Sequence, residues 1–264
     1  MQQPDTAQLE ERKLTRRRWL KRMLLAAPVL GVLNALWWEP TWLKVSRPKL
    51  SLPDAKTRIV HLTDLHHKGN RAWLEKVVKA INKLEPQVVC FTGDLVEEKS
   101  FLPETLEILS AIKAPIFGVP GNHDDWSGIN FTDVKRAFQK NGGDWLEDGS
   151  VMMDNGRLAI VGATTKKAIP PAPKADRRVL MFHYPLWVEK LGNQTYDLML
   201  AGHSHGGQVR LPGLGALILP YQVGQYDLGM FQTKAGPLYV GAGIGCFMWQ
   251  LRFNCRPELA VFEV

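Results

Sequence analysis

The stretch that decides the fold is residues 57–66, which have the sequence TRIVHLTDLH. A short run rich in β-branched residues, typical of a buried strand, is followed by a short motif that contains Asp64 and His66. Residues 88–94, with the sequence VVCFTGD, repeat this arrangement and place Asp94 directly after a second strand. Apolar residues between the two runs recur at the spacing of a helix. The order strand, helix, strand predicts a layered α/β fold.

The rest of the chain continues this alternation. The length of 264 residues predicts one large domain or one domain plus an appendage. Hydrophobic residues make up 45% and charged residues 22% of the chain, which are ordinary values for a globular protein. These values exclude wholesale disorder, a collagen-like repeat and a polytopic membrane protein. The predicted helices are 73–84, 103–112 and 132–140, and the predicted strands are 57–63, 88–92, 116–119, 158–163, 179–183, 198–201, 238–240 and 259–263.

The first forty residues form a separate unit, with a polar start, a basic cluster and an apolar run from Met23 to Trp38. This is the outline of an export signal. Residues 15–21, with the sequence TRRRWLK, resemble the bacterial twin-arginine signal, so the export machinery of that pathway is an expected partner. The alternative is a cytosolic basic amphipathic anchor. The run favours the export signal because Asn34 is its only polar side chain.

The signal is expected to remain as a membrane anchor, because Leu33-Asn34-Ala35 places a bulky Leu where a cleavage site needs a small side chain. The run would span about 24 Å as a helix, less than the roughly 30 Å of a hydrocarbon core, and flanking arginines could reach the interface. Arginines before the run and tryptophans after it place the domain on the periplasmic or extracytoplasmic face of the cytoplasmic membrane. The predicted division is an anchor at 1–38, a linker at 39–55 and a globular domain at 56–264.

Charge and cysteine content exclude several classes of site. The net charge is +7, and residues 1–50 carry +6 of it, so the domain lacks the positive excess that binds a phosphate backbone, and no nucleic-acid partner is expected. The three cysteines lack the spacing of a zinc knuckle or redox pair. Cys90 is predicted to be a buried thiol. Cys246 and Cys255 are either a disulfide or two free thiols.

Polar groups rich in histidine and carboxylate follow five of the predicted strands, where open α/β sheets bind their ligands. They contain five of the seven histidines, and their nitrogen and oxygen donors suit divalent transition metals. One such motif alone is more often a turn or a surface pair, but five in order predict a metal site. The motifs are DLH at 64–66, GD at 93–94, GNHD at 121–124, His183, and GHSHGG at 202–207.

In this order the motifs resemble the calcineurin-like metallophosphoesterase superfamily, whose pattern is D-x-H, G-D, G-N-H-D/E, H and G-H-x-H. Residues 206–212, 239–245 and 252–258 further resemble its YkuE/YaeI-type branch. Gly241-Ala242 departs from that branch, where a bulkier and more polar pair is expected, and His67 has no clear counterpart. The resemblance covers the chain from about residue 55 onward and implies a four-layer α/β/β/α sandwich.

The resemblance implies a site for two divalent metal ions, with Asp94 as the bridging ligand. Manganese is the expected metal, and iron, zinc and cobalt are the alternatives. His123 would protonate the leaving oxygen or stabilise the transition state, and Asp124 would orient His123 through a hydrogen bond. The remaining ligands would be Asp64, His66 and His205 for one ion, and Asn122, His183 and His203 for the other.

Three further polar residues have alternative interpretations. His61 lies within a predicted strand and is interpreted as a packed or surface histidine. His67 is interpreted as exposed in a loop, with a contact to substrate as the alternative. Arg210 either binds a phosphate or forms a structural salt bridge.

The expected function is that of a metal-dependent phosphoric ester hydrolase. Phosphodiesters or pyrophosphate-linked diesters are the preferred substrates, because a membrane-held enzyme meets lipids and envelope precursors first, and related members resemble UDP-2,3-diacylglucosamine pyrophosphatases. A phosphomonoesterase is the first alternative. A wall- or membrane-binding protein with a structural metal site is the alternative from another class.

Two apolar stretches follow the metal-site motifs in sequence. The first runs from Leu211 to Tyr221, and the second is Phe247-Met248-Trp249. Both are either packed hairpins of the core, as apolar runs of this length usually are, or an exposed rim that contacts acyl chains or a membrane.

Overall fold

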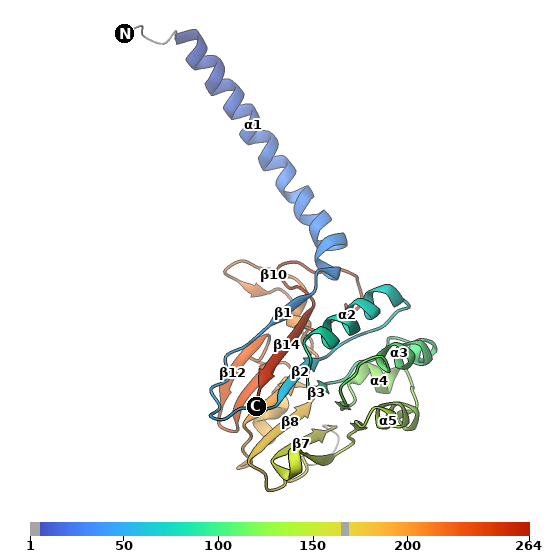
Figure 1. Cartoon of the computed structure of the whole chain (residues 1–264). Coiled ribbons are helices and arrows are strands. Elements are labelled where there is room, and N and C mark those ends of the chain that lie inside the picture. The colour runs from blue at the N-terminus through green and yellow to red at the C-terminus, as the bar shows by residue number, and fades with distance from the viewer. Residues whose placement is uncertain (1–5, 165–168) are drawn as a thin grey trace.

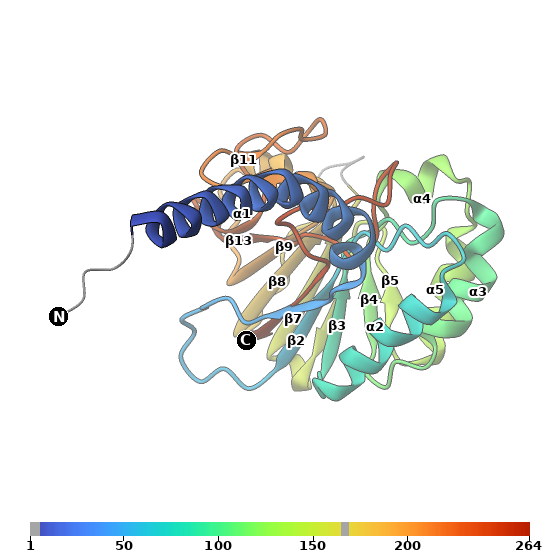
Figure 2. The same ribbon diagram turned by 90° about the horizontal axis from the view of Figure 1, so that it is seen from above.

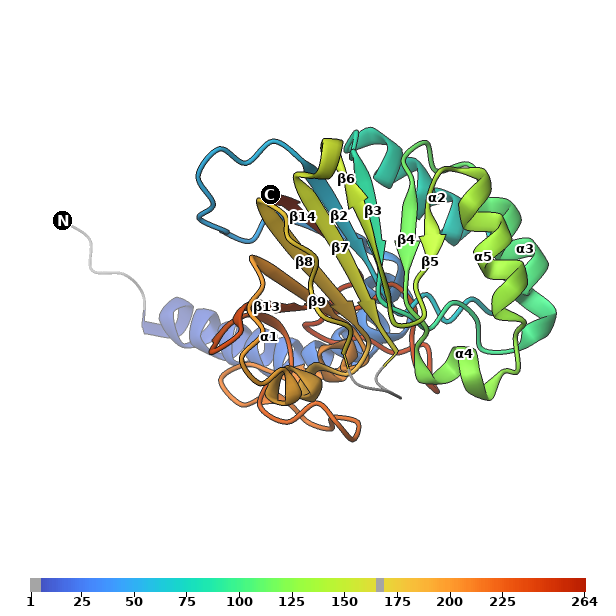
Figure 3. The same ribbon diagram turned by 90° about the horizontal axis from the view of Figure 1, so that it is seen from below.

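Two six-stranded sheets form the centre of the molecule in the computed structural model, which describes residues 6–164 and 169–264 (Figure 1). The sheets pack face to face (Figures 2 and 3). The outer face of the first sheet is covered by the helices α2 (Arg71–Lys83), α3 (Leu102–Leu109) and α5 (Phe131–Lys140). A 3₁₀ helix at Pro185–Lys190 and neighbouring loops cover the outer face of the second sheet. The predicted α/β fold of two sheets with outer layers is therefore confirmed.

The first sheet has the strand order β1-β14-β2-β3-β4-β5. Strands β2 to β5 run parallel to one another, whereas β14 is antiparallel to β2 and parallel to β1. In the order of the sheet, the strands are β1 Lys44–Ser46, β14 Glu258–Glu263, β2 Arg58–Leu62, β3 Val88–Phe91, β4 Ile116–Gly118 and β5 Asp144–Trp145.

The second sheet has the strand order β12-β13-β9-β8-β7-β6. Strands β7, β8, β9 and β13 run parallel, and β6 and β12 pair antiparallel at the two edges. A separate hairpin joins β10 Arg210–Leu211 to β11 Gly215–Ala216. In the order of the sheet, the strands are β12 Gly229–Thr233, β13 Gly236–Val240, β9 Leu198–Ala201, β8 Arg177–Phe182, β7 Leu158–Ala163 and β6 Gly149–Met153.

Helix α2 shows why the helices form: its apolar residues recur at helical spacing, and a side chain caps its N-terminus. In α2, the side chain of Asn70 accepts a hydrogen bond from Trp73 N at the first turn, and Pro86 follows the last turn. Its buried residues recur at helical spacing and face the first sheet. The helices are α2 Arg71–Lys83, α3 Leu102–Leu109, α4 Asn122–Trp126 and α5 Phe131–Lys140.

Successive side chains of each strand point to opposite faces of its sheet, so the core is divided into layers. In β2, Ile59 faces the second sheet, and its neighbour Val60 faces the helices. Residues Cys90 and Phe117 of the first sheet pack against Ile160 and its neighbours in the second sheet. Both faces of the first sheet are therefore buried, which explains why its strands are continuous apolar runs.

All eight predicted strands form, each within two residues of its expected ends. The three predicted helices also form. The sequence patterns missed the short elements β1, β5, β10, β11 and α4, together with the edge strands β6 and β12. These elements are brief or half exposed, so they lack an apolar run that a pattern detects.

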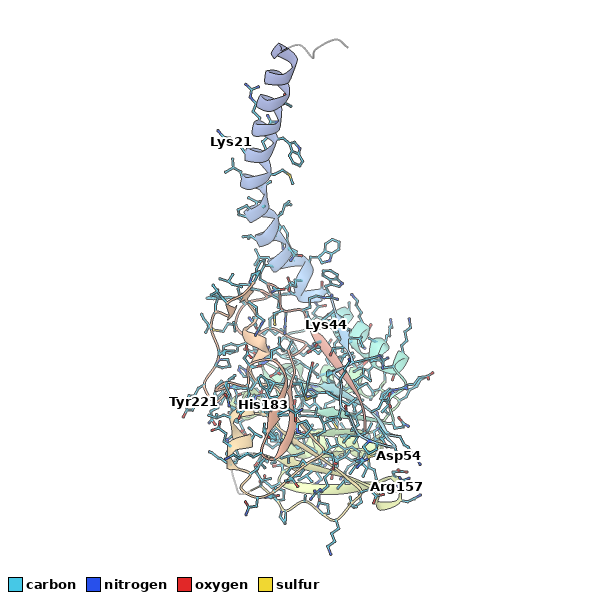
Figure 4. The ribbon with its side chains drawn as sticks, turned by 90° about the vertical axis from the view of Figure 1, so that its left-hand side faces the viewer. Lys21, Lys44, Asp54, Arg157, His183 and Tyr221 are labelled. Carbon is cyan, nitrogen blue, oxygen red and sulfur yellow. The ribbon has the colours of Figure 1, made fainter. Side chains whose placement is uncertain are left out.

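Helix α1, Thr6–Leu33, continues through a π-helical turn at Asn34–Trp38 and a 3₁₀ turn at Glu39–Thr41. It projects away from the sheets (Figures 1 and 4). Its segment Lys21–Thr41 is long and apolar enough to cross a membrane, a test that a signal sequence also passes. This agrees with the expectation of an N-terminal apolar helix.

The division of the chain at residues 38 and 55 stays a prediction, and the structure adds detail within the interval 39–55. Residues 44–46 form strand β1 at the edge of the first sheet. Glu39 is buried and accepts a hydrogen bond from Cys255 N at 2.6 Å. The start of the expected linker is therefore packed on the domain. All three cysteines are free thiols, so the open question of a disulfide between Cys246 and Cys255 is resolved in favour of two thiols.

Candidate metal centre

Loops that follow five strands meet at the carboxyl ends of these strands, on one side of the two sheets. Strands β2, β3 and β4 deliver three of these loops from the first sheet, and β8 and β9 deliver two from the second. Because these strands are parallel within each sheet, their carboxyl ends lie on the same side. The structure brings together all nine predicted site residues there: Asp64, His66, Asp94, Asn122, His123, Asp124, His183, His203 and His205.

The backbone of these loops is strained. Five of the seven predicted ligands have positive φ, a conformation that costs energy in residues other than glycine. At Gly121 an added Cβ would overlap the carboxylate of Asp94, so this position requires glycine. Strain of this kind persists where a site needs a particular geometry. The five strained ligands are Asp64 (52°), His66 (40°), Asp94 (63°), His203 (67°) and His205 (48°).

The carboxylate of Asp94 lies at the centre of the cluster. Its Oδ2 is 3.3 Å from His66 Nε2 and also 3.3 Å from His183 Nε2. Its Oδ1 accepts a hydrogen bond from the backbone N–H of His123 at 2.8 Å. One carboxylate oxygen therefore faces histidines from both sides of the cluster.

The donor atoms of the cluster form two groups, and Asp94 belongs to the second. Asp64, His66 and His205 form one group, and Asp94, His183 and His203 form the other, each with its donor atoms within 4.8 Å of one another. His66, Asp94 and His123 meet the same distance limit. The amide oxygen of Asn122 lies 3.0 Å from His183 Nε2, beside the second group. These groups could hold metal ions.

Hydrogen bonds from outside the cluster orient its histidines. His183 Nδ1 lies 2.7 Å from the carbonyl of Thr92, and His66 Nδ1 lies 2.8 Å from Glu97 Oε2. Both rings therefore donate through Nδ1 and direct Nε2 toward Asp94. His203 reverses this arrangement, because its Nε2 lies 2.8 Å from the carbonyl of Tyr221. Sequence reasoning missed Glu97, whose position three residues past the motif that ends at Asp94 gave no signal.

His205 indicates that the donor set suits a cation. Its Nε2 lies 3.0 Å from His66 Nε2, and among the described residues its buried Nδ1 has no hydrogen-bond partner. Two imidazole lone pairs aimed at each other in a buried site repel unless a proton or a cation lies between them. The nitrogen and oxygen donors of the cluster are those that divalent transition metals accept. The residues therefore fit the metal centre that the motifs predict.

Burial and neighbouring charge shift the pKa values of the histidines His66 and His183 in opposite directions. Burial opposes the charged form of His66, but hydrogen bonds to Asp94 and Glu97 outweigh it and raise the pKa of His66 to about 10. For His183, the charge of Asp94 likewise outweighs burial and raises the pKa to about 9. Burial raises the pKa of the Asp64 carboxyl. The buried carboxylates thus attract positive charge into the site, which a metal ion supplies when it binds.

The expected role of Asp124 needs correction. Its carboxylate was predicted to orient His123, but it accepts hydrogen bonds from the backbone N–H groups of Asp94, Leu95 and Gly121, each at 2.8 Å. Both carboxylate oxygens are therefore used to tie two loops together. The carboxylate that faces the ring of His123 is Glu97, whose Oε2 lies 3.3 Å from His123 Nδ1.

The other polar candidates lie outside the cluster. His67 was interpreted as exposed, but it is buried and pairs with Glu104 at 2.7 Å. Of the two alternatives for His61, packed or at the surface, the structure shows a packed histidine, whose Nε2 lies 2.8 Å from Thr92 Oγ1. Arg210 pairs with Asp227 at 2.8 Å, which supports the salt-bridge alternative.

A cavity of about 160 Å³ opens beside Asn122. Tyr184, Trp187 and Lys190 line it, and the ammonium group of Lys190 lies 4.2 Å from the ring centre of Trp187. The cavity thus places the ammonium group of Lys190 and two aromatic side chains, Tyr184 and Trp187, beside the metal cluster.

Comparison with known families agrees with this geometry. A model of the calcineurin-like phosphoesterases matches residues 57–207, which include every residue of the cluster. The chain belongs to this family. It is thus a metallophosphoesterase, an enzyme class that cleaves phosphoric esters with the help of metal ions. Its sheets and helices agree with the fold that the resemblance implies.

Three relatives in the family match most of the chain. Metallophosphoesterase YkuE of Bacillus subtilis is 29% identical, over 96% of this chain and 98% of that protein. Phosphodiesterase YaeI of Escherichia coli is 29% identical, over 86% of this chain and 90% of that protein. UDP-2,3-diacylglucosamine pyrophosphatase LpxG of Chlamydia trachomatis is 27% identical, over 91% of this chain and 94% of that protein. The relatives that match thus include YkuE and YaeI, the two proteins whose branch the motifs resemble.

Proposed function

We propose that this protein is a phosphodiesterase that uses two divalent metal ions and works at the outer face of a bacterial cytoplasmic membrane. The position of Asp94 carries the proposal. One oxygen of its carboxylate lies 3.3 Å from a histidine in each donor group, a position that suits a ligand shared by two ions. Asp64, His66 and His205 would complete one ion's ligands, and Asn122, His183 and His203 would complete the other's.

Hydrogen bonds within the chain fix the orientation of the Asp64 carboxylate. Thr63 Oγ1 donates to Asp64 Oδ2 at 2.8 Å, and the backbone N–H of His203 also donates to Asp64. These bonds hold the carboxylate in one orientation. When bound, divalent ions would lower the pKa of the attacking water and neutralise charge on the phosphoryl oxygens. Manganese is the proposed metal, with iron, zinc and cobalt as alternatives.

His123 is the proposed acid for the leaving group. Its ring packs edge to face against His66 with ring centres 4.5 Å apart, so it lies beside the cluster and remains outside the two main donor groups. Glu97 holds its Nδ1, which leaves Nε2 to face substrate. A proton held there would pass to the ester oxygen as its bond to phosphorus breaks.

The proposed substrates are phosphoric diesters, including pyrophosphate-linked and lipid-linked diesters. A diester has two substituents, and the cavity beside Asn122 offers room for one of them. Similarity to phosphodiesterase YaeI supports a diester, and similarity to the pyrophosphatase LpxG supports a substrate that carries acyl chains. The apolar helix and the twin-arginine pattern support export and attachment to the membrane.

The test uses the full chain, purified in detergent, stripped of metal and reloaded with manganese, iron, zinc or cobalt. Bound metal is measured by mass spectrometry, and rates are measured on bis-p-nitrophenyl phosphate and p-nitrophenyl phosphate. We expect about two ions per chain and faster hydrolysis of the diester. Faster hydrolysis of the monoester would make the protein a phosphomonoesterase. Bound metal without hydrolysis of either compound would support a structural metal site.

A further inference from the structure

The two apolar stretches that follow the metal-site motifs are exposed. We call six of the exposed residues of these stretches the apolar collar: Leu214, Leu217, Ile218, Phe247, Met248 and Trp249. Leu214 and Ile218 are each 80% exposed, and Trp249 is 71% exposed. The alternative of packed core hairpins is therefore wrong for these six residues. Six large apolar side chains on two neighbouring loops indicate a surface that contacts something apolar.

The loops of the collar also contact the metal centre. The chain that leaves the hairpin reaches Tyr221, whose carbonyl lies 2.8 Å from His203 Nε2 and whose side chain points outward (Figure 4). In the second loop, the ring of Phe247 lies with its centre 5.3 Å from that of His123. The same Phe247 ring is 6.3 Å from the ring of His66. The collar is thus the outer edge of the metal site.

The second of these loops contacts the base of the N-terminal helix, and the hairpin is bonded to that loop. The backbone N–H of Arg252 donates to the carbonyl of Ala35 at 3.0 Å. Residue Phe253 pairs with Val209 just before the hairpin, and Arg210 N donates to the carbonyl of Phe253 at 2.9 Å. Figure 1 shows the β10–β11 hairpin at the end of the domain from which α1 projects. The helix base, the hairpin and the second loop therefore form one connected surface.

Residues 42 and 43 separate the candidate membrane span from the first strand of the domain. The span ends at Thr41, and strand β1 of the first sheet begins at Lys44. The guanidinium of Arg256 lies 3.8 Å from the ring centre of Trp42 and donates to the carbonyls of Trp42 and Leu43. The domain consequently cannot move far from the end of the span. Exposed Trp37 and Trp38 lie within that end of the span, where tryptophan favours a membrane interface.

We propose that the apolar collar docks on the lipid bilayer that the N-terminal helix crosses, so that the metal centre opens toward the headgroup layer. This inference rests on the proposed function, because it identifies the source of the substrate. An amphiphilic phosphoric ester can then reach the metal site by moving along the bilayer, with its acyl chains kept in lipid. Continuity with the span favours lipid over a second copy of the chain as the occupant of the collar.

The first experiment measures the environment of the collar directly. The full chain is reconstituted in vesicles of phosphatidylethanolamine and phosphatidylglycerol, with Cys246→Ser to remove the partly exposed thiol. The fluorophore NBD is attached at Ile218→Cys or Met248→Cys, and at Met152→Cys as the control. Met152 is also exposed, but it lies in the edge strand β6 of the second sheet. Brominated acyl chains and aqueous iodide are the two quenchers.

We expect lipid bromine to quench the labels at 218 and 248, with iodide excluded, and the reverse at 152. Iodide access at 218 or 248 equal to that at 152 would overturn docking. Labels at 218 and 248 that are shielded from both quenchers would overturn it as well, because a second copy of the chain would then cover the collar.

The second experiment separates docking from chemistry. Trp249→Ser should raise the KM for phosphatidyl-p-nitrophenol in vesicles by about tenfold, because one large apolar contact with lipid is lost. It should leave kcat/KM on soluble bis-p-nitrophenyl phosphate unchanged, as should Met152→Ser on both substrates. Equal losses on both substrates would overturn the inference. A wild-type chain that hydrolyses no diester would defeat the proposed function, whereas the fluorescence measurement would still decide docking.

Discussion

Glu97 provides the sharpest test of how the metal site is held. Its Oε2 accepts the Nδ1 proton of His66 at 2.8 Å and lies 3.3 Å from His123 Nδ1. Glu97→Gln keeps the size of the side chain and removes its charge. The bond to His66 then loses its ionic character, and His66 becomes a weaker ligand.

The expected loss follows from the exposure of Glu97. Changing a group that orients a metal ligand costs roughly tenfold to a hundredfold in metal affinity. The Glu97 side chain is 26% exposed, so solvent screens its charge and favours the lower end of that range. We therefore expect about a tenfold loss of affinity, or about 1.4 kcal/mol.

The assay is a competition titration of manganese into the metal-free full chain, together with kcat/KM on bis-p-nitrophenyl phosphate. Glu98→Gln is the matched control, because Glu98 is adjacent in sequence and exposed. The hydrogen bond to His66 lowers the pKa of Glu97 below its ordinary value of 4.5, so the difference from wild type should persist throughout the range from pH 8 to pH 5. Equal affinities for Glu97→Gln, Glu98→Gln and wild type would refute the role of Glu97.

Four further predictions follow from the structure. Asp94→Asn should reduce bound metal and activity more than a change of any other ligand, and near-normal turnover with both ions bound would contradict the shared position. His123→Ala should keep both metals but slow hydrolysis of poor leaving groups by about 10²-fold to 10⁴-fold, with a smaller effect on good ones; metal loss would instead make His123 a ligand. Lysine in place of both Arg16 and Arg17 should leave folded protein in the cytosol, as cell fractionation would reveal, and continued export would indicate the general secretory route. Burial lowers the pKa of His61 to about 3, below its value of about 6.5 in the unfolded chain, so stability is full above pH 6.5 and falls toward pH 3 by up to about 1.4 kcal/mol per unit. His61→Gln should flatten this dependence in thermal unfolding, and an unchanged profile would contradict it.

The main elements of the fold and the convergence of the motif residues were predictable from local patterns. Buried strands such as β3 are continuous apolar runs, and α2 has an apolar stripe with a cap, so both are visible in a short window of sequence. The site residues were predictable because parallel strands end on one side of a sheet. Asp64 and Asp94 each follow such a strand, so their place just after a strand in the sequence predicted that they lie together in the site.

The partners of those residues depended on contacts between distant segments. Asp124 and Glu97 are both carboxylates near a strand-end motif, and nothing in the order of residues distinguishes their roles. Folding directs Asp124 to three backbone N–H groups and brings Glu97 to His66 and His123. Hydrogen-bond partners are set by side-chain direction and by loop geometry, which a sequence window does not contain.

The same distinction applies to the apolar stretches and to the helix at the N-terminus. By itself, the sequence determined that residues 23–38 are apolar and that two apolar stretches follow the histidine motifs. Composition is the same whether such a stretch is packed or exposed, because exposure depends on which other elements cover it. Only the tertiary structure decided that Ile218 and Trp249 are exposed, and that the bonds of Arg252 and Arg256 bring their loops to the base of the helix.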